Sequence, residues 1–291
     1  MSKRKFVIVT DSTCDMPAEF YKKKGVEVVK LGFTMDNVNY EGDCGQKITE
    51  KVFYEKLRAG SMPTTYQVTV ESARPHLEKY LKDGQDILVI AFSSALSGTA
   101  DSFSLCVKEL SKMYPTRKLC MVDSLCASMG EGLLLYYAIK KADEGADIEE
   151  TAKYLQEIRL KICHYFTVDN LFHLKRGGRV SSASALIGTL LKIKPIMRVN
   201  DGGKLEVISK CVGRKKALSI LVSHLFADWE EERNEPVFIS HGDCLEEAEF
   251  VKSMIAQRFP NAEIMINYIG PVIGSHSGAG TLAIFYKGEK R

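Results

Sequence analysis

One stretch of the chain indicates the fold class most clearly, namely Asp86-Ile87-Leu88-Val89-Ile90-Ala91-Phe92. A short, uninterrupted apolar run bounded by polar residues is typical of a strand that is buried on both faces. It is followed by Ser93-Ser94-Ala95-Leu96-Ser97-Gly98-Thr99 and then by residues 100–113, which have the length and pattern of a helix. A buried strand, a short polar loop and a helix together form one unit of a parallel α/β sheet.

The same succession of apolar runs and helical patterns occurs through the first half of the chain. Residues 6–10, 25–31 and 118–122 are predicted to be further buried strands. Helices are predicted after a cap at Asp15 with Pro17 in the first turn, over residues 50–59 with Thr49 as the cap, and over residues 131–142. This alternation predicts a mainly parallel sheet with helices on both faces, whose ligand edge is the carboxyl end of the strands.

The pattern changes in the second half. Asp147 is predicted to cap a helix over residues 148–161, and Asn200-Asp201-Gly202-Gly203 is a strong hairpin signal between predicted strands at 194–199 and 204–210. The other predicted elements are strands at 163–168, 236–241, 262–268 and 281–286, and helices at 183–191, 214–228 and 245–258. We therefore expect an N-terminal α/β domain over residues 1–155 and a C-terminal α+β domain with antiparallel strands over residues 156–291.

Composition argues against several classes of protein. The 291 residues are 26% charged and 45% hydrophobic, and 40 Lys plus Arg against 37 Asp plus Glu give a net charge of only +3, which disfavours nucleic-acid binding. No run approaches the roughly 18 apolar residues of a membrane span. Residues 6–9 are too short a run for a signal peptide, so we expect a cytoplasmic protein. The eight cysteines are dispersed, without zinc spacing, and neither disulfides nor a metal or other cofactor is expected.

Short hydroxyl-rich loops follow three of the predicted strands. For two of them, residues 10–13 and 123–124, helix capping is favoured over ligand binding. The loop at residues 93–99 has four hydroxyl side chains and a glycine, which is more than one cap needs, and it opens a helix whose free N–H groups attract anions. A small anionic group is the natural partner of this loop.

A glycine-rich stretch precedes the last predicted strand, Gly274-Ser275-His276-Ser277-Gly278-Ala279-Gly280. Its glycines lack the Cβ atoms that would keep a ligand away from the backbone. Alone, the stretch fits an ordinary turn, an anion-binding loop or a nucleophile elbow, but G-x-S-x-G requires serine where this chain has His276. An aspartyl-phosphate enzyme is also disfavoured, because Thr13 stands where a second Asp would follow Asp11.

The remaining candidates are neutral hydrogen-bond donors with a few cations. Thr65, Ser94 and His276 can donate to a carboxylate, and Arg179 offers a positively charged fork. Two glycines precede Arg179 and let the chain turn this side chain back toward the domain junction, whereas Arg176 is interpreted as a surface charge. The apolar stretch at residues 185–191 fits either the core or the lining of a long apolar pocket.

Taken together, these pieces resemble the DegV family from residue 7 to about residue 285. The matching motifs are Val9-Thr10-Asp11-Ser12-Thr13-Cys14-Asp15, Thr65-Tyr66-Gln67, the loop at residues 93–99, Val122-Asp123-Ser124, Leu174-Lys175-Arg176-Gly177-Gly178-Arg179-Val180, and the stretch from Ile269-Gly270-Pro271-Val272-Ile273 into residues 274–278. The resemblance implies a two-domain protein that encloses a long-chain fatty acid between its domains. It also implies a bacterial fatty-acid-binding subunit, not itself an enzyme, that presents the carboxylate to a separate ATP-binding fatty acid kinase subunit for acyl phosphate formation.

Carried over by position, the resemblance implies carboxylate contacts at Thr65, Ser94, His276 and Arg179. The supporting residues are Ser93, Ser97, Gly98, Ser277 and Gly278. His276 would act as a hydrogen-bond donor or a cation, and transient contact with a membrane or an acyltransferase is expected. The chain departs from the family pattern at Tyr66, Val68 and Ala279, which changes the pocket mouth. Two alternatives stay open, an enzyme acting on a small phosphorylated or carboxylated metabolite and a lipid-responsive regulatory protein.

Overall fold

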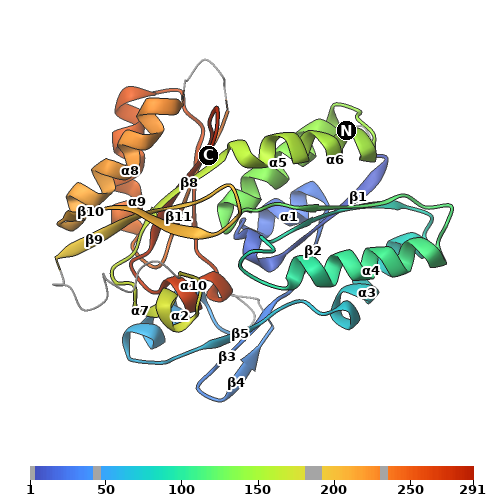
Figure 1. Ribbon diagram of the computed structural model, residues 1–291, viewed down its shortest axis with the longest axis horizontal. Coiled ribbons are helices and arrows are strands. Elements are labelled where there is room, and N and C mark those ends of the chain that lie inside the picture. Colours follow the sequence, from blue (N-terminus) through green and yellow to red (C-terminus); the bar gives the residue numbers. More distant parts are fainter. Residues whose placement is uncertain (1–3, 42–46, 181–191, 230–234) are drawn as a thin grey trace.

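The structure is a computed structural model that describes residues 4–41, 47–180, 192–229 and 235–291. Two main β-sheets lie side by side with helices around and between them, and a small third sheet lies at the bottom of the view in Figure 1. The predicted helix at residues 183–191, with its apolar stretch 185–191, lies outside the described residues.

The first main sheet has the strand order β2-β1-β6-β7, and all its neighbours are parallel. Its strands are β1 (Phe6–Asp11), β2 (Val26–Val29), β6 (Asp86–Ala91) and β7 (Leu119–Asp123). Successive side chains point to opposite faces, so that Ile8 packs toward α5 (Met129–Asp143) and α6 (Ile148–Ile158), while Val9 packs toward α3 (Val70–Lys82) and α4 (Thr99–Met113). The predicted parallel sheet with helices on both faces is confirmed.

The second main sheet has six strands in the order β10-β9-β8-β13-β11-β12. They are β8 (Ile162–Thr167), β9 (Ile193–Val199), β10 (Leu205–Val212), β11 (Val237–His241), β12 (Ile264–Tyr268) and β13 (Leu282–Lys287). Pairing is antiparallel, including the predicted β9–β10 hairpin, except that β11 and β12 are parallel and joined through α9 (Leu245–Arg258). Helix α8 (Arg214–Asp228) covers one face, and α5 lies between the two main sheets.

The third sheet was not predicted. It pairs β4 (Val38–Tyr40), β3 (Gly32–Met35) and β5 (Thr64–Tyr66) in that order, all antiparallel. Beside it lie α2 (Glu50–Arg58), capped by Thr49 as predicted, and α10 (Pro271–Ser277). These strands are only three or four residues long, too short to show a periodic pattern. Among the described residues, no helix is both long and apolar enough to cross a membrane.

Three local predictions were wrong. Helix α1 (Ala18–Lys24) begins after Pro17, and Asp15 does not cap it, because Asp15 is buried in a left-handed conformation with its carboxylate turned inward. The glycine-rich stretch is not a loop throughout, since α10 extends to Ser277. The basic sequence of residues 171–180, with its two glycines, predicts a turn, but it contains α7 (Phe172–Arg176). Helix α10 forms despite Gly274, and α7 ends at Gly177, so in both places a helical turn lies next to or across glycines, which local propensity alone does not anticipate.

Candidate functional site

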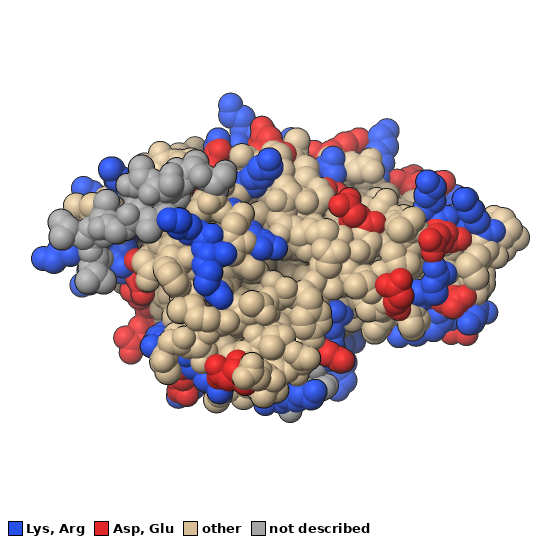
Figure 2. All heavy atoms as spheres, turned by 60° about the horizontal axis from the view of Figure 1, so that its bottom comes forward, with Lys and Arg blue, Asp and Glu red and all other residues tan. Residues whose placement is uncertain are grey.

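A cavity lies between the two main sheets and is bordered at one end by α10 and β5. Its volume is about 160 Å³ on a scale where one water molecule needs roughly 10–15 Å³, so it has room for a ligand of many atoms. The wall is mainly apolar and is formed by Leu31, Phe92, Leu96, Phe166, Leu174, Val199, Leu205, Ile269, Val272, Ile273, Ala283 and Phe285. Figure 2 shows a central hollow on the face that carries the small sheet, surrounded by uncharged surface with Lys and Arg side chains to one side.

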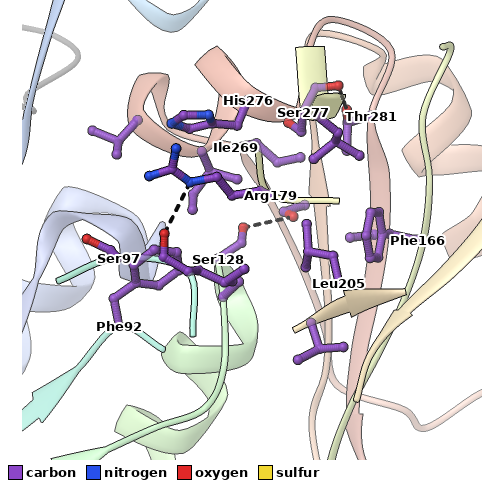
Figure 3. Close-up of a pocket in the computed structure, with 18 of the residues that line it drawn as sticks. Phe92, Ser97, Ser128, Phe166, Arg179, Leu205, Ile269, His276, Ser277 and Thr281 are labelled. Carbon is purple, nitrogen blue, oxygen red and sulfur yellow. Dashed lines mark hydrogen bonds between the residues drawn. The ribbon is translucent and has the colours of Figure 1, made fainter. Parts of the chain in front are cut away.

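Polar side chains gather at one end of the cavity. Thr65 from β5 and His276 from the last turn of α10 are 211 positions apart in the sequence, yet Oγ1 and Nε2 lie 2.8 Å apart. Arg179 and Ser97 line the same cavity, and Figure 3 shows the Arg179 guanidinium beside the His276 imidazole. The structure therefore brings together Thr65, His276 and Arg179, three of the four predicted carboxylate contacts.

His276 is neutral near pH 7. Burial, together with the positive charges of Arg179 and Arg176 and the neighbouring His173, lowers its pKa to about 4. Of the two roles considered for His276, cation or hydrogen-bond donor, this lowered pKa favours the donor.

The surroundings of His276 also favour one tautomer. Nδ1 is buried without a hydrogen-bond partner among the described residues and faces Gly177, where an added Cβ would lie 2.1 Å from it. A buried N–H donor without a partner is costlier than an unpaired lone pair, so the proton belongs on Nε2. Nε2–H then donates to Thr65 Oγ1, and the Thr65 hydroxyl keeps its own proton to donate to an anion.

Arg179 connects the two halves of the molecule. Its Nε donates to the carbonyl of Leu96, 3.2 Å away in the loop after β6, and its Nη1 donates to the carbonyl of Gly177. This guanidinium supplies positive charge next to Thr65 and His276. Arg176 was interpreted as a surface charge and is exposed, but its Nη2 donates to the carbonyls of Pro63, 2.8 Å away, and Ser275, 3.2 Å away. Arg176 therefore also ties the segment before Thr65 to the helix that carries His276.

The three serines after β6 differ in their positions, and only Ser97 lines the cavity. Ser94 is exposed and does not line the cavity, and its hydroxyl donates to Asp123 Oδ2, 2.5 Å away. Ser97 is the serine of this loop that does line it, with its Oγ 3.0 Å from the hydroxyl of Thr99. Ser93 is buried and donates to the carbonyl of Gly203, 2.9 Å away, so it joins the two halves instead of facing a ligand.

The remaining supporting residues differ in their positions. Ser277 is buried and lines the cavity, and its Oγ has no partner among the described residues. Gly98 and Gly278 act through their missing side chains, because a Cβ would lie 2.5 Å from Gln67 at Gly98 and 2.6 Å from His173 at Gly278.

Tyr66 forms part of the mouth of the cavity, as its departure from the family pattern suggested. It lines the cavity and is 45% exposed, and its hydroxyl donates to the carbonyl of Tyr40, 3.1 Å away. The ring lies on Gly32, where any Cβ would overlap it. The ring is thus held against the small sheet at the edge of the opening.

Sequence reasoning missed four polar residues in the cavity wall, Ser128, His164, Ser240 and Thr281. Ser128, just before α5, and Ser240, on β11, both line it and are buried. Ser128 follows the Asp123-Ser124 loop, for which capping was favoured, and Ser240 lies in an apolar strand that gave no signal of a ligand.

Fold and cavity together define an α/β protein that encloses an apolar space between two sheets, with hydroxyl, imidazole and guanidinium groups at one end. The chain belongs to the DegV family. The model of this family, described as "Uncharacterised protein, DegV family", matches residues 5–289. A DegV domain-containing protein of Clostridium perfringens is 44% identical over 288 residues, 99% of each chain.

Solved structures of the family agree with the fold. A DegV family protein from Thermus thermophilus, described as fatty acid binding, matches with a TM-score of 0.86 and 30% identity, covering 98% of this chain and 100% of its own. DegV from Bacillus subtilis, described as a fatty acid binding protein, matches with a TM-score of 0.84 and 29% identity, covering 99% of this chain and 100% of its own.

Proposed function

We propose that this protein binds a long-chain fatty acid in the cavity, with the acyl chain against the apolar wall and the carboxylate at the Thr65–His276 end. The observation that carries this proposal is the combination of an enclosed apolar cavity with donors gathered at one end. Each buried methylene contributes about 0.8 kcal/mol, so the chain supplies affinity while the polar end fixes its orientation. Relatives described as fatty acid binding support the same ligand class.

In this proposal the carboxylate is held by a neutral relay and one cation. Nε2–H of His276 donates to Thr65, the Thr65 hydroxyl donates to the carboxylate, and Arg179 supplies the balancing charge. Ser97 and Ser277 offer further hydroxyls, and the unpartnered Oγ of Ser277 gains a partner when a ligand is present. Ser94 is not retained as a contact, because its hydroxyl is engaged by Asp123 outside the cavity.

We further propose that a separate ATP-binding kinase subunit takes the bound carboxylate and forms acyl phosphate. In this proposal the protein itself performs no phosphoryl chemistry, and His276 serves as a hydrogen-bond donor. A boundary near residues 155 and 156 would place the ligand between two domains, since residues from both sides of it line the cavity.

Mass spectrometry of lipids extracted from the purified, denatured protein tests this function. We expect about one fatty acid per protein molecule, either co-purified or taken up from solution. Thr65→Val removes the donated proton but keeps the shape and is expected to lower retention by about tenfold, the loss of one hydrogen bond to a charged group. Thr65→Ser is the matched control and should retain most binding. Absence of any bound fatty acid would refute the function.

For the kinase step, the purified protein loaded with fatty acid is mixed with candidate ATP-binding subunits, and acyl phosphate is measured. Formation that requires both proteins supports the proposal. Acyl phosphate formed by this protein and ATP alone would contradict it.

A further inference from the structure

Two serine hydroxyls lie inside the apolar part of the cavity. Ser128 is 5% exposed and Ser240 is fully buried, and their Oγ atoms lie 3.2 Å apart. Figure 3 shows Ser128 beyond Arg179 as seen from His276, with the dashed line from its hydroxyl leading toward the side of Phe166 and Leu205. An acyl chain that extends from the Thr65–His276 end would contact these hydroxyls along its length.

A buried carboxyl group lies behind the pair. Asp15 Oδ2 is 2.6 Å from Ser128 Oγ, and Asp15 Oδ1 accepts a hydrogen bond from the backbone N–H of Gly270, 3.0 Å away. The Asp15 carbonyl accepts from Asn267 Nδ2 at 2.8 Å, so the residue is held from three segments of the chain. Asp15, Ser128 and Ser240 thus form one hydrogen-bonded row that ends at the cavity.

Counting the protons along this row shows whether Ser240 can donate a hydrogen bond to the cavity or only accept one. If Asp15 is ionised, Ser128 must donate to it and Ser240 must donate to Ser128, which leaves only lone pairs on Ser240 for the cavity. If Asp15 is protonated on Oδ2, it can donate to Ser128 and Ser128 can donate to Ser240, so that Ser240 has a free proton, while the Gly270 N–H still donates to Oδ1. Burial is the main cause that raises the pKa of Asp15 to about 8, so both arrangements are accessible near neutral pH.

A ligand hydroxyl is the one common substituent that satisfies both arrangements, because it donates and accepts. A carbonyl satisfies only the second, and a methylene satisfies neither. Both hydroxyls already have a hydrogen-bond partner, since Ser128 contacts Asp15 and Ser240. An unsubstituted chain therefore leaves unused only the remaining capacity of Ser240, which is costly in the second arrangement, where its proton has no acceptor.

We propose that Ser128 and Ser240, backed by Asp15, form a second polar contact that selects acyl chains bearing a hydroxyl group along the chain. This inference rests on the proposed fatty-acid function and adds the substrate class. The Thr65–His276 end holds the carboxylate of any fatty acid, whereas the serine pair distinguishes among chains.

The test is a competition. The protein, stripped of lipid, is incubated with equal amounts of octadecanoic acid and of monohydroxyoctadecanoic acids that differ in hydroxyl position, and the retained lipids are measured by mass spectrometry. We expect at least one hydroxylated isomer to be retained about tenfold over octadecanoic acid, a ratio that corresponds to about 1.4 kcal/mol. Ser240→Ala should bring the ratio close to one.

Thr65→Val is the matched control, because it weakens the contact that both ligands share and should lower total retention without changing the ratio. Retention of octadecanoic acid with no preference for any hydroxylated isomer would overturn this inference and leave the proposed function standing, as would a preference that survives Ser240→Ala. Retention of neither kind of fatty acid would overturn both.

Discussion

Replacing Asp15 by asparagine should stabilise the protein increasingly as pH rises. The pKa of Asp15 is raised from 3.8 to about 8, mainly by burial, with further contributions from the negative charges of Asp11 and Glu50. A raised carboxyl pKa means that the native state binds the proton more tightly than the unfolded chain. Stability is then greatest below the unfolded pKa and is lost as pH rises from about 4 to about 8.

The magnitude follows from these two pKa values. They are about four pH units apart, at 1.36 kcal/mol each, so full ionisation costs roughly 5–6 kcal/mol, of which about 3–4 kcal/mol falls between pH 5 and pH 8. Asparagine keeps the geometry, because its oxygen accepts from the Gly270 N–H and its amide donates to Ser128 Oγ. Between pH 5 and pH 8, the free energy of unfolding of Asp15→Asn should therefore fall by about 3–4 kcal/mol less than that of the wild type.

The assay is urea unfolding of both proteins at a series of pH values, with Asp83→Asn as a control at an exposed carboxyl. The other buried carboxyls among the described residues, Asp11 and Glu131, also have raised pKa values, mainly through burial, and they titrate in both proteins. The difference therefore reports Asp15 together with its charge coupling to these two groups. Parallel stability curves for wild type and Asp15→Asn would refute the reasoning.

Three further predictions concern other parts of the molecule. Gly177→Ala would place a Cβ 2.1 Å from His276 Nδ1 and should lower fatty acid retention at least tenfold. Gly178→Ala, at φ +69 with nothing within 4 Å of the added Cβ, should lower the free energy of unfolding by about 1 kcal/mol and keep retention. Equal retention in both variants would contradict the packing argument. Arg291→Met removes the guanidinium that donates to the carbonyls of Leu125, Ile162 and Asn200 at 2.7–3.1 Å. This change should lower the free energy of unfolding by about 2–4 kcal/mol. An unchanged midpoint of urea unfolding would show that these contacts add nothing to stability. His276 should titrate near pH 4 by NMR, and Arg179→Met should raise its pKa. Because the pKa is lowered in the folded state, the native state should lose stability as pH falls below about 6.5. Titration at the ordinary histidine pKa would refute a buried neutral imidazole.

The main layers of the fold could be predicted from the sequence because buried parallel strands are uninterrupted apolar runs. Residues 86–92 and their helix carry that signal without ambiguity, and the Asn200-Asp201-Gly202-Gly203 turn fixed the hairpin in the second sheet. Strand β5, which carries Thr65, has only three residues and pairs with β3 through tertiary contact, so its sequence gives no comparable pattern. Helix α3 contains Pro75, which masks it as a helix from sequence alone.

The candidate site could be predicted by residue type more reliably than by position. Thr65, His276 and Arg179 converge on one cavity, but only the structure shows which serine of residues 93–99 faces it. Ser94 and Ser97 are both hydroxyls in one loop, and their directions depend on the partner that each finds, Asp123 for Ser94 and Thr99 for Ser97. Nor could spacing reveal that Asp15, taken for a helix cap, would hold Ser128 at the cavity wall.

The most direct test of the central claim is the position of a bound carboxylate. A fatty acid labelled with ¹³C at its carboxyl carbon is bound to the protein, and its resonance is followed in the wild type and in variants. We expect one bound resonance that shifts in Thr65→Val and in Arg179→Met but stays in place in Ser240→Ala, which lies along the chain. A resonance that is unmoved by Thr65→Val and Arg179→Met, or that moves only in Ser240→Ala, would contradict a carboxylate held at the Thr65–His276 end.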